Sequence, residues 1–395
     1  MHSQAEKPRM YPTLYDLVLD LFGLSIPPFR LVQSFGMMVA LAFLAASIDL
    51  KSELKRKEGL GLLAPVKKKV WKGKTSTLIE KAISGIVGFA IGYKFLALFL
   101  DFDAIAVNPQ VFILSAEGNM LGGFLGAALS IGTRIWEDKK EGLAEPKEVE
   151  INVHPYEQVG TITILAAVFG ILGAKIFHNL ENLDELMADP VGALVSFSGL
   201  SFLGGLICGT SSILYFAKKN NIKLLHLTDA SLPGLMLAYG IGRMGCQIAG
   251  DGDWGIPNDA PQPEWLSFLP DWTWAYNYPN NVLGVDLKTD FAQMGYVSLT
   301  GYAWPTPLYE IVMALTIYAF FRFMRTRWTV PGMIMSWYLI LAGFERLAIE
   351  QIRINNEYPI FGGVTQAEII STVMILVGIV FLFLMPKVGK KWAEY

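Results

Sequence analysis

The stretch "QAEIISTVMILVGIVFLFLM", residues 366–385, decides the class of fold. It runs for 20 residues, and Glu368 is its one charged side chain. A helix of about 20 apolar residues is long enough to cross the hydrocarbon core of a bilayer, about 30 Å. The composition agrees, because 53% of the 395 residues are hydrophobic and only 17% are charged. The sequence therefore predicts an all-α membrane protein.

Eight further segments resemble this one in length and composition, which predicts a polytopic transmembrane helix bundle of about nine spans. The expected spans lie near residues 31–48, 79–100, 118–136, 159–179, 199–217, 227–247, 307–325, 332–350 and 366–385. Glycines recur at intervals of four in the second and third spans, as Gly88 and Gly92 and as Gly118, Gly122 and Gly126. Such spacing lets helix backbones approach closely within a membrane.

The charge of the loops predicts the direction of the spans. Nine Lys and Arg residues follow the first span in residues 51–74, and shorter basic loops read "KKNNIK", "RTR" and "KVGKK". The alternate loops are acidic or neutral, and residues 248–305 carry seven acids against Lys288 alone. Because basic loops stay in the cytoplasm, the N-terminus is expected outside and the C-terminus inside.

We expect one membrane-embedded domain over residues 1–395, with two distinct parts. Residues 51–155 form a cytoplasmic basic loop and two spans, and contact with anionic lipid explains the basic run more simply than a nucleic-acid partner. Residues 248–305 form an extracytoplasmic acidic arm rich in tryptophan, a residue that prefers the headgroup level. Cys208 and Cys246 are expected to be packing residues, and no histidine spacing indicates a metal centre.

Charged residues at the outer ends of two spans are the candidate functional residues. Arg243 closes the sixth span, and "GFERLAIEQIRIN" places Glu345, Arg346, Glu350 and Arg353 at the end of the eighth. The last three recur at helical intervals, which predicts one helix face. A structural ion-pair network is one interpretation. The other is a phosphate site at the headgroup level, because a guanidinium binds phosphate with two parallel hydrogen bonds.

Seven segments together resemble the prolipoprotein diacylglyceryl transferase family in sequence, order and spacing. They are "LVQSFGMMVALAF", "GAKIFHNLENLDELMADP", "GLSFLGGLICG", "DASLPGLMLAYGIGRMGCQIAGDGDWG", "TPLYE", "PGMIMSWYLILAGFERLAIEQIR" and "VTQAEIISTVMILVGI". The resemblance covers residues 31–47 and 159–386 and is strongest over 229–255. Residues 51–155 then stand as an insertion that adds two spans to the usual seven of the family.

The resemblance implies a reaction in the cytoplasmic membrane of a bacterium, at the outer-leaflet side. A diacylglyceryl group passes from phosphatidylglycerol to the lipobox cysteine thiol of a lipoprotein precursor, and glycerol phosphate is released. No cofactor or metal is implied. Arg243 and Arg346 match family arginines and are expected to bind the phosphate and stabilise the leaving group. The other residues implied to bind substrate or to support these arginines are Glu350, Arg353, Tyr309 and Gly255. Tyr309 and Glu310 match the family's "LYE" element, and helix packing near the site is an alternative to direct contact for both.

Several positions depart from the family pattern. Leu203 stands in the usual place of a histidine that could act as base, and Phe35 in that of a tyrosine. Cys246 and Ala249 replace two asparagines of the signature. Loss of the histidine leaves the route of the substrate thiol's proton open.

Four routes for this proton remain. Asp251, Asp253 or Glu345 could accept it, since the family's signature glutamate matches either aspartate. Alternatively, the arginines lower the pKa of the thiol so that no dedicated base is needed.

A noncatalytic relative that binds phosphatidylglycerol or a lipoprotein precursor is the alternative function. A small-solute transporter is disfavoured, because the sequence contains no inverted repeat.

Overall fold

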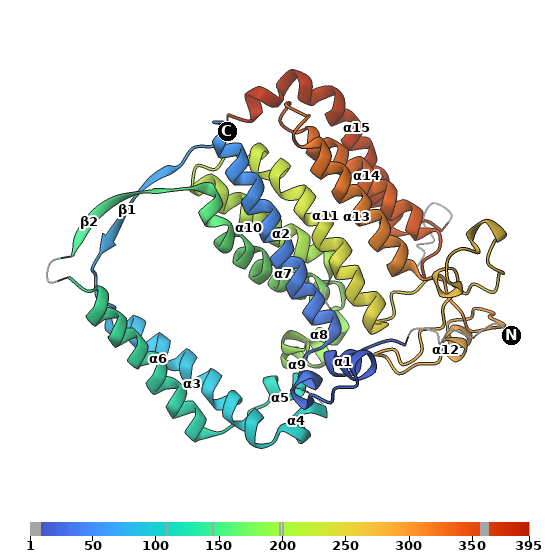
Figure 1. Ribbon diagram of the computed structural model, residues 1–395, viewed down its shortest axis with the longest axis horizontal. Helices are drawn as coiled ribbons and strands as arrows, with labels where there is room; N and C mark the ends of the chain where they lie inside the picture. The colour runs from blue at the N-terminus through green and yellow to red at the C-terminus, as the bar shows by residue number, and fades with distance from the viewer. Residues whose placement is uncertain are drawn as a thin grey trace. The chain divides into compact units, whose positions relative to one another are not determined.

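Each of the nine segments expected to span the membrane falls on a helix of the computed structural model (Figure 1). The structure describes residues 9–107, 109–143, 146–196, 199, 201–355 and 363–394. The nine helices are α2 (Ser34–Gly59), α3 (Leu78–Leu100), α6 (Met120–Glu141), α7 (Val159–Glu181), α10 (Phe202–Lys219), α11 (Leu224–Ala249), α13 (Thr306–Met324), α14 (Met333–Glu350) and α15 (Gln366–Trp392). Among the described residues, α2, α3, α7, α13 and α15 are long and apolar enough to cross a membrane. The chain is a mostly helical, multi-pass membrane protein. The count of nine spans stays a prediction.

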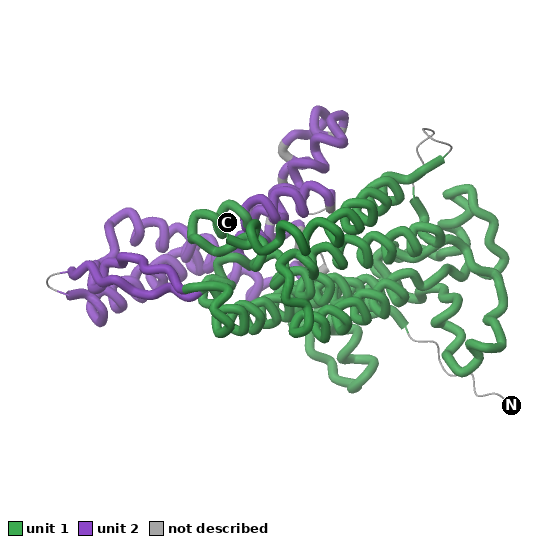
Figure 2. The backbone as a smooth tube through the Cα atoms, turned by 90° about the horizontal axis from the view of Figure 1, so that it is seen from above, with its two compact units in different colours: residues 1–64, 155–163, 214–395 green, residues 65–154, 164–213 purple. Residues whose placement is uncertain are grey.

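The chain divides into two units, which Figure 2 shows in different colours. Unit 1 comprises Met1–Ala64, Pro155–Thr163 and Leu214–Tyr395, and unit 2 comprises Pro65–His154 and Ile164–Ile213. In unit 1, α11 packs against both α2 and α13, and α14 packs against α15. Its shorter elements are α1 (Leu14–Phe22), η1 (Pro27–Leu31), η2 (Pro155–Gln158), η3 (Glu264–Leu266), η4 (Asp271–Thr273) and α12 (Leu287–Gln293). The single membrane-embedded domain expected from the sequence stays a prediction.

The α2 helix continues to Gly59, about three turns beyond the expected end at residue 48. These added turns carry Asp49 and Glu53, whose side chains are almost fully buried. Arg322 lies 2.7 Å from Asp49, and Arg325 lies 3.3 Å from a carboxylate oxygen of each acid. Ion pairs with arginines at and just after the end of α13 therefore offset the cost of burying these two acids. Hydropathy alone treats the acids as a reason to end the span, so it predicted too short a helix.

Glycines join the two long helices of the inserted segment in unit 2. A Cβ atom on Gly92 would lie 2.2 Å from the carbonyl oxygen of Gly122, and one on Gly88 would lie 2.5 Å from that of Gly126. The α3 and α6 backbones are thus too close for any larger side chain at these positions. The close approach predicted from the glycine spacing is confirmed.

Unit 2 also contains α4 (Phe102–Val107), α5 (Pro109–Leu114), α8 (Leu183–Ala188) and α9 (Pro190–Val195).

A two-stranded antiparallel ribbon occupies part of the region for which the sequence predicted only a basic loop and spans. Strand β1 (Val66–Lys72) pairs with β2 (Lys147–Val153), from Val66 opposite Val153 to Lys72 opposite Lys147. The prediction missed it because 74 residues separate Lys72, the last residue of β1, from Lys147, the first residue of β2. Only tertiary pairing brings the two strands together.

The acidic arm, residues 248–305, folds around its own aromatic core. Trp254, Tyr276, Tyr278 and Phe291 are at most 2% exposed and pack together with Met10 from the N-terminal segment. This core supports the arm as a folded element that covers the ends of α11 and α13. Its position at the outer surface of the membrane stays a prediction.

The loop charges give a testable topology. Cysteines introduced at Leu60 and Lys219 should react with a membrane-impermeant maleimide only after the cells are opened, whereas cysteines at Asp184 and Pro270 should react in intact cells. The physical reason is the retention of basic loops in the cytoplasm. Labelling of positions 60 and 270 from the same side would contradict the nine-span topology.

Candidate active site

The C-terminal end of α11 places the signature residues against one another. The helix ends at Ala249, and Gly250 follows with φ 62°, a left-handed conformation that favours glycine. Its N–H donates to the carbonyl oxygen of Cys246. The chain thus reverses direction directly after the helix and brings Asp251 and Asp253 back beside its last turns.

Arg243 and Arg353 alternate with two carboxylates in a partly buried ion-pair network. Asp253 accepts a hydrogen bond from Arg243 on one carboxylate oxygen and from Arg353 on the other. Glu310 of α13, whose side chain is fully buried, lies 3.1 Å from Nε of Arg243 and 3.5 Å from Nη1 of Arg353. Thr306 donates to the backbone oxygen of Asp253 at 2.5 Å. The network therefore joins α11, the arm, α13 and the segment after α14, and its two positive and two negative charges balance.

Arg353 does not continue the α14 helix, so the prediction that it shares a helix face with Arg346 and Glu350 is wrong. The helix ends at Glu350, and Arg353 forms an isolated β-bridge with Gly255. A Cβ atom on Gly255 would lie 2.2 Å from the carbonyl oxygen of Ile352. Glycine is therefore required for a close approach of two backbones, and this approach places Arg353 beside Asp253.

Arg346 has no ion pair with the network of Arg243, Arg353, Asp253 and Glu310 in the part of the chain that the structure describes. Its Nη2 atom lies 2.7 Å from Glu350, one turn further along α14, and Thr365 donates to the other oxygen of Glu350 at 2.6 Å. The Arg346 side chain is 29% exposed, compared with 17% for Arg243 and 16% for Arg353. Of these three guanidinium groups, that of Arg346 is the most accessible to a ligand.

Tyr239 and Glu345 extend the network toward the interior of the bundle. The Tyr239 hydroxyl lies 2.8 Å from Glu310 and 3.3 Å from Glu345, and the Arg243 guanidinium carbon lies 5.2 Å from the centre of the Tyr239 ring. The sequence analysis did not single out Tyr239. Its position four residues before Arg243, on the same face of α11, was the available signal.

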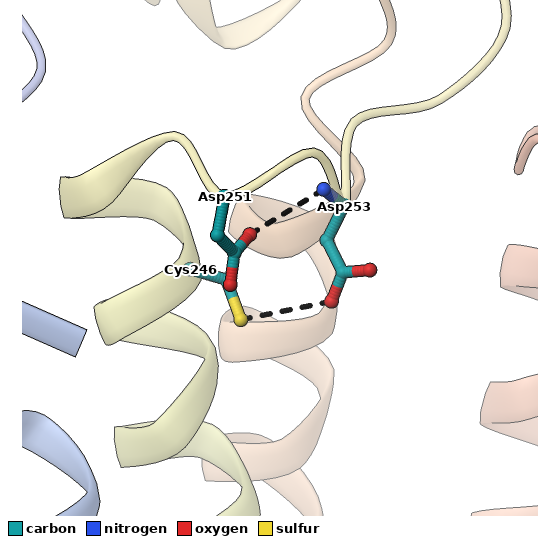
Figure 3. A group of neighbouring side chains, drawn as sticks. All are labelled: Cys246, Asp251 and Asp253. Atoms are coloured by element: carbon teal, nitrogen blue, oxygen red, sulfur yellow. Dashed lines mark hydrogen bonds between the residues drawn. The ribbon is translucent and has the colours of Figure 1, made fainter. Parts of the chain in front are cut away.

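A thiol and two carboxylates meet at the end of α11, as Figure 3 shows. The Sγ atom of Cys246 and one carboxylate oxygen each of Asp251 and Asp253 lie within 4.8 Å of one another. This Sγ atom lies 3.6 Å from a carboxylate oxygen of Asp253 and 3.8 Å from Nη1 of Arg243. Cys246 is buried, as the packing prediction requires, but it also lines the site. Guanidinium groups already contact both oxygens of Asp253, which places two positive charges beside this carboxylate.

The two aspartates differ in their electrostatic surroundings. Burial raises the pKa of Asp251 above its ordinary value. Burial also acts to raise the pKa of Asp253, but the positive charges of Arg243 and Arg353 outweigh it and lower this pKa. Asp253 is therefore suited to remain an anion that holds the arginines, and Asp251 is the better proton acceptor of the two.

Two further positions singled out in the sequence form no ion pair within the described part of the chain. The Tyr309 hydroxyl donates to the backbone oxygen of Thr273 at 2.9 Å, so this side chain secures the arm to α13. Leu203 belongs to α10 and to unit 2.

Comparison with known proteins supports the resemblance seen in the sequence. The family model described as prolipoprotein diacylglyceryl transferase matches residues 140–384, which is more than half of the chain. The chain belongs to the prolipoprotein diacylglyceryl transferase family. The matched range contains every member of the ion-pair network, together with Arg346, Glu350 and Asp251.

Two relatives carry the same name, phosphatidylglycerol–prolipoprotein diacylglyceryl transferase. The protein from Prochlorococcus marinus (strain MIT 9215) is 30% identical over 316 residues, which cover 71% of this chain and 97% of the relative. The protein from Dehalococcoides mccartyi (strain ATCC BAA-2266 / KCTC 15142 / 195) is 26% identical over 230 residues, which cover 57% of this chain and 76% of the relative. This member of the family is therefore similar to transferases along most of its length.

Proposed function

We propose that this protein transfers the diacylglyceryl group of phosphatidylglycerol to the lipobox cysteine thiol of lipoprotein precursors and releases glycerol phosphate. Membership of the family supports the reaction class. The observation that carries the assignment of the site is the pair Arg243 and Arg353, which both contact Asp253 where the end of α11 meets the acidic arm. Arg346 lies one turn before the end of α14, paired with Glu350. Membrane lipids and precursor proteins are the proposed partners, and the proposed site faces the outer leaflet of the bacterial cytoplasmic membrane.

The reaction requires one bond to form and one to break. The substrate sulfur forms a bond to the glycerol carbon, and the bond between this carbon and the phosphate oxygen breaks. The leaving phosphate keeps the bonding electron pair, so negative charge builds up on its oxygen. The thiol proton must pass to a base before or during the attack. A site for this reaction needs a thiolate, donors to the leaving phosphate and protection from water.

We assign the phosphate to Arg346 and Arg243. Arg346 is the most exposed of the three guanidiniums, and among the described residues its ion pair with Glu350 leaves further N–H donors for a ligand. Arg243 uses Nη1 and Nε in its ion pairs, which hold the guanidinium in a fixed orientation. A fixed donor can stabilise charge as it develops without reorganising during the reaction. Arg353 and Glu350 act by positioning these two arginines.

We assign the thiol proton to Asp251. Three carboxylates are open candidates from the sequence, and the differences between their surroundings favour Asp251. Asp253 has an arginine on each oxygen, and Glu345 accepts from Tyr239 on the interior side of the network. Asp251 has a pKa raised by burial and stands beside the Cys246 thiol, in surroundings that already accommodate sulfur. A base with a raised pKa holds the abstracted proton more firmly.

An assay of the purified chain tests the proposed function. The chain is reconstituted in nanodiscs that contain phosphatidylglycerol, a lipobox peptide is added, and release of glycerol phosphate and the mass of the peptide are measured. We expect both glycerol phosphate and a diacylglyceryl peptide. A peptide with serine in place of the lipobox cysteine is the control and should give neither. Lipid or peptide binding without either product would favour the noncatalytic alternative.

A further inference from the structure

The register of the β1–β2 ribbon sorts its side chains onto two faces of different chemistry. Residues directly opposite each other in an antiparallel pair share a face, and successive residues alternate between faces. The face that we call the valine face carries Val66, Lys68, Val70, Lys72, Lys147, Val149, Ile151 and Val153. The other, the tryptophan face, carries Lys67, Lys69, Trp71, Glu148, Glu150 and Asn152.

The pairing confines all the acidic side chains of the two strands to the tryptophan face. There, Lys69 lies 3.4 Å from Glu148, and Lys67 lies 4.0 Å from Glu150, so two positive and two negative charges balance. The valine face carries three lysines and no acid within the strands. Its aliphatic side chains are partly in solvent, with Val70 and Val149 37% exposed and Ile151 41% exposed. Exposed aliphatic groups with lysines on the same face are typical of a surface that lies on anionic lipid headgroups.

Short connections join the ribbon to helices that can cross a membrane. The six residues 60–65 join α2 to β1, and the five residues 73–77 join β1 to α3. Both helices are apolar enough to cross a membrane, and the predicted nine-span topology puts the connection between them on the cytoplasmic side. Seven residues of strand extend about 23 Å. The end of the ribbon that is joined to α3 is therefore within reach of the headgroups, and one face can turn toward them.

We propose that the valine face of the ribbon docks on anionic lipid headgroups, in the leaflet where α2 ends and α3 begins. The aliphatic side chains enter the interface, and Lys72 and Lys147 contact lipid phosphates. The two ion pairs of the tryptophan face remain in water. This docking does not depend on the proposed transfer reaction.

Photocrosslinking of the full-length chain tests which face meets lipid. Benzoylphenylalanine is introduced at Val149, on the valine face, or at the adjacent Glu148, on the tryptophan face. Each protein is placed in nanodiscs of phosphatidylcholine with or without phosphatidylserine, which is not the proposed substrate. We expect lipid adducts at position 149 that increase with phosphatidylserine and decrease with added salt, and few adducts at position 148. Equal adducts at both positions, adducts to protein at 149 or yields independent of phosphatidylserine would overturn the proposal.

Matched lysine variants test the charge contribution. With the probe at position 149, Lys72→Gln with Lys147→Gln removes two charges from the valine face, and Lys67→Gln with Lys69→Gln removes two from the other. The first pair should weaken the phosphatidylserine-dependent adduct by about fivefold for each lysine at low salt, because a lysine near an anionic surface contributes about 1 kcal/mol. The second pair should leave it nearly unchanged. An equal loss in both pairs, or protection of position 149 by added RNA in lipid-free detergent, would contradict lipid docking.

Discussion

Arg243→Lys is expected to lower turnover by about 10²–10³-fold, the range observed when one donor to a developing negative charge is removed. Lysine keeps the charge, but it cannot reproduce the two fixed directions in which Arg243 meets Asp253 and Glu310. Glycerol phosphate release and the thermal midpoint of the purified protein are the measurements. The functional interpretation predicts a large loss of turnover with a near-normal midpoint.

The structural interpretation of the same residue predicts the opposite pattern. Lysine would be tolerated, and Arg243→Ala would lower stability by about 3–5 kcal/mol, because the buried Glu310 and the partly buried Asp253 would each lose a partner. Arg325→Lys is the matched control, since Arg325 also bridges two carboxylates but lies in the Asp49 and Glu53 cluster. As a structural ion-pair residue it should tolerate lysine, with a near-normal midpoint and near-normal turnover. Full turnover in Arg243→Lys would remove this arginine from the proposed phosphate site.

Arg346→Lys should show the same loss of turnover with less effect on stability. Within the described part of the chain Arg346 pairs with Glu350 alone, and its side chain is the most exposed of the three arginines. Arg346→Ala should therefore cost less folding free energy than Arg243→Ala. Equal losses of stability in the two alanine variants, with turnover retained in Arg346→Lys, would show that Arg346 only holds Glu350.

Asp251→Asn is expected to lower turnover by about a hundredfold or more, the usual scale for loss of a general base. A base works in its ionised form, so wild-type turnover should rise with pH as Asp251 loses its proton. Burial raises this pKa, which moves the rise to a higher pH than for an exposed aspartate. Turnover as a function of pH is the measurement, and the variant should lack this rise while keeping its affinity for lipid.

Asp253→Asn separates the roles of the two aspartates. Its carboxylate contacts two arginines, so the variant should lose stability and disorder both guanidiniums, whereas the pH-dependent rise due to Asp251 should persist. Full turnover in Asp251→Asn and in the double variant would exclude a carboxylate base at these positions. Activation of the thiol by the arginines would then be the better explanation.

Local patterns in the sequence determined the membrane class, the positions of the helices and the family. Apolar runs of helical length are visible without tertiary contacts, because each helix satisfies its own backbone hydrogen bonds. The glycine spacing likewise predicted the α3–α6 contact, since small residues at intervals of four form one face of a helix. Arg243, Arg346 and the two aspartates could be named because they stand at the ends of apolar runs within a recognisable signature.

Only the tertiary structure decided how these residues are paired. Glu310 and Tyr239 reach Arg243 from positions that hydropathy assigns to ordinary helix packing. Arg353 leaves the helical periodicity because Gly255 permits a backbone contact that positions it beside Asp253. The extension of α2 and the β1–β2 ribbon also depend on partners far along the chain. Such ion pairs and strand pairs form between residues that are close in space but far apart in the sequence. Local sequence patterns do not reveal which of these residues will meet.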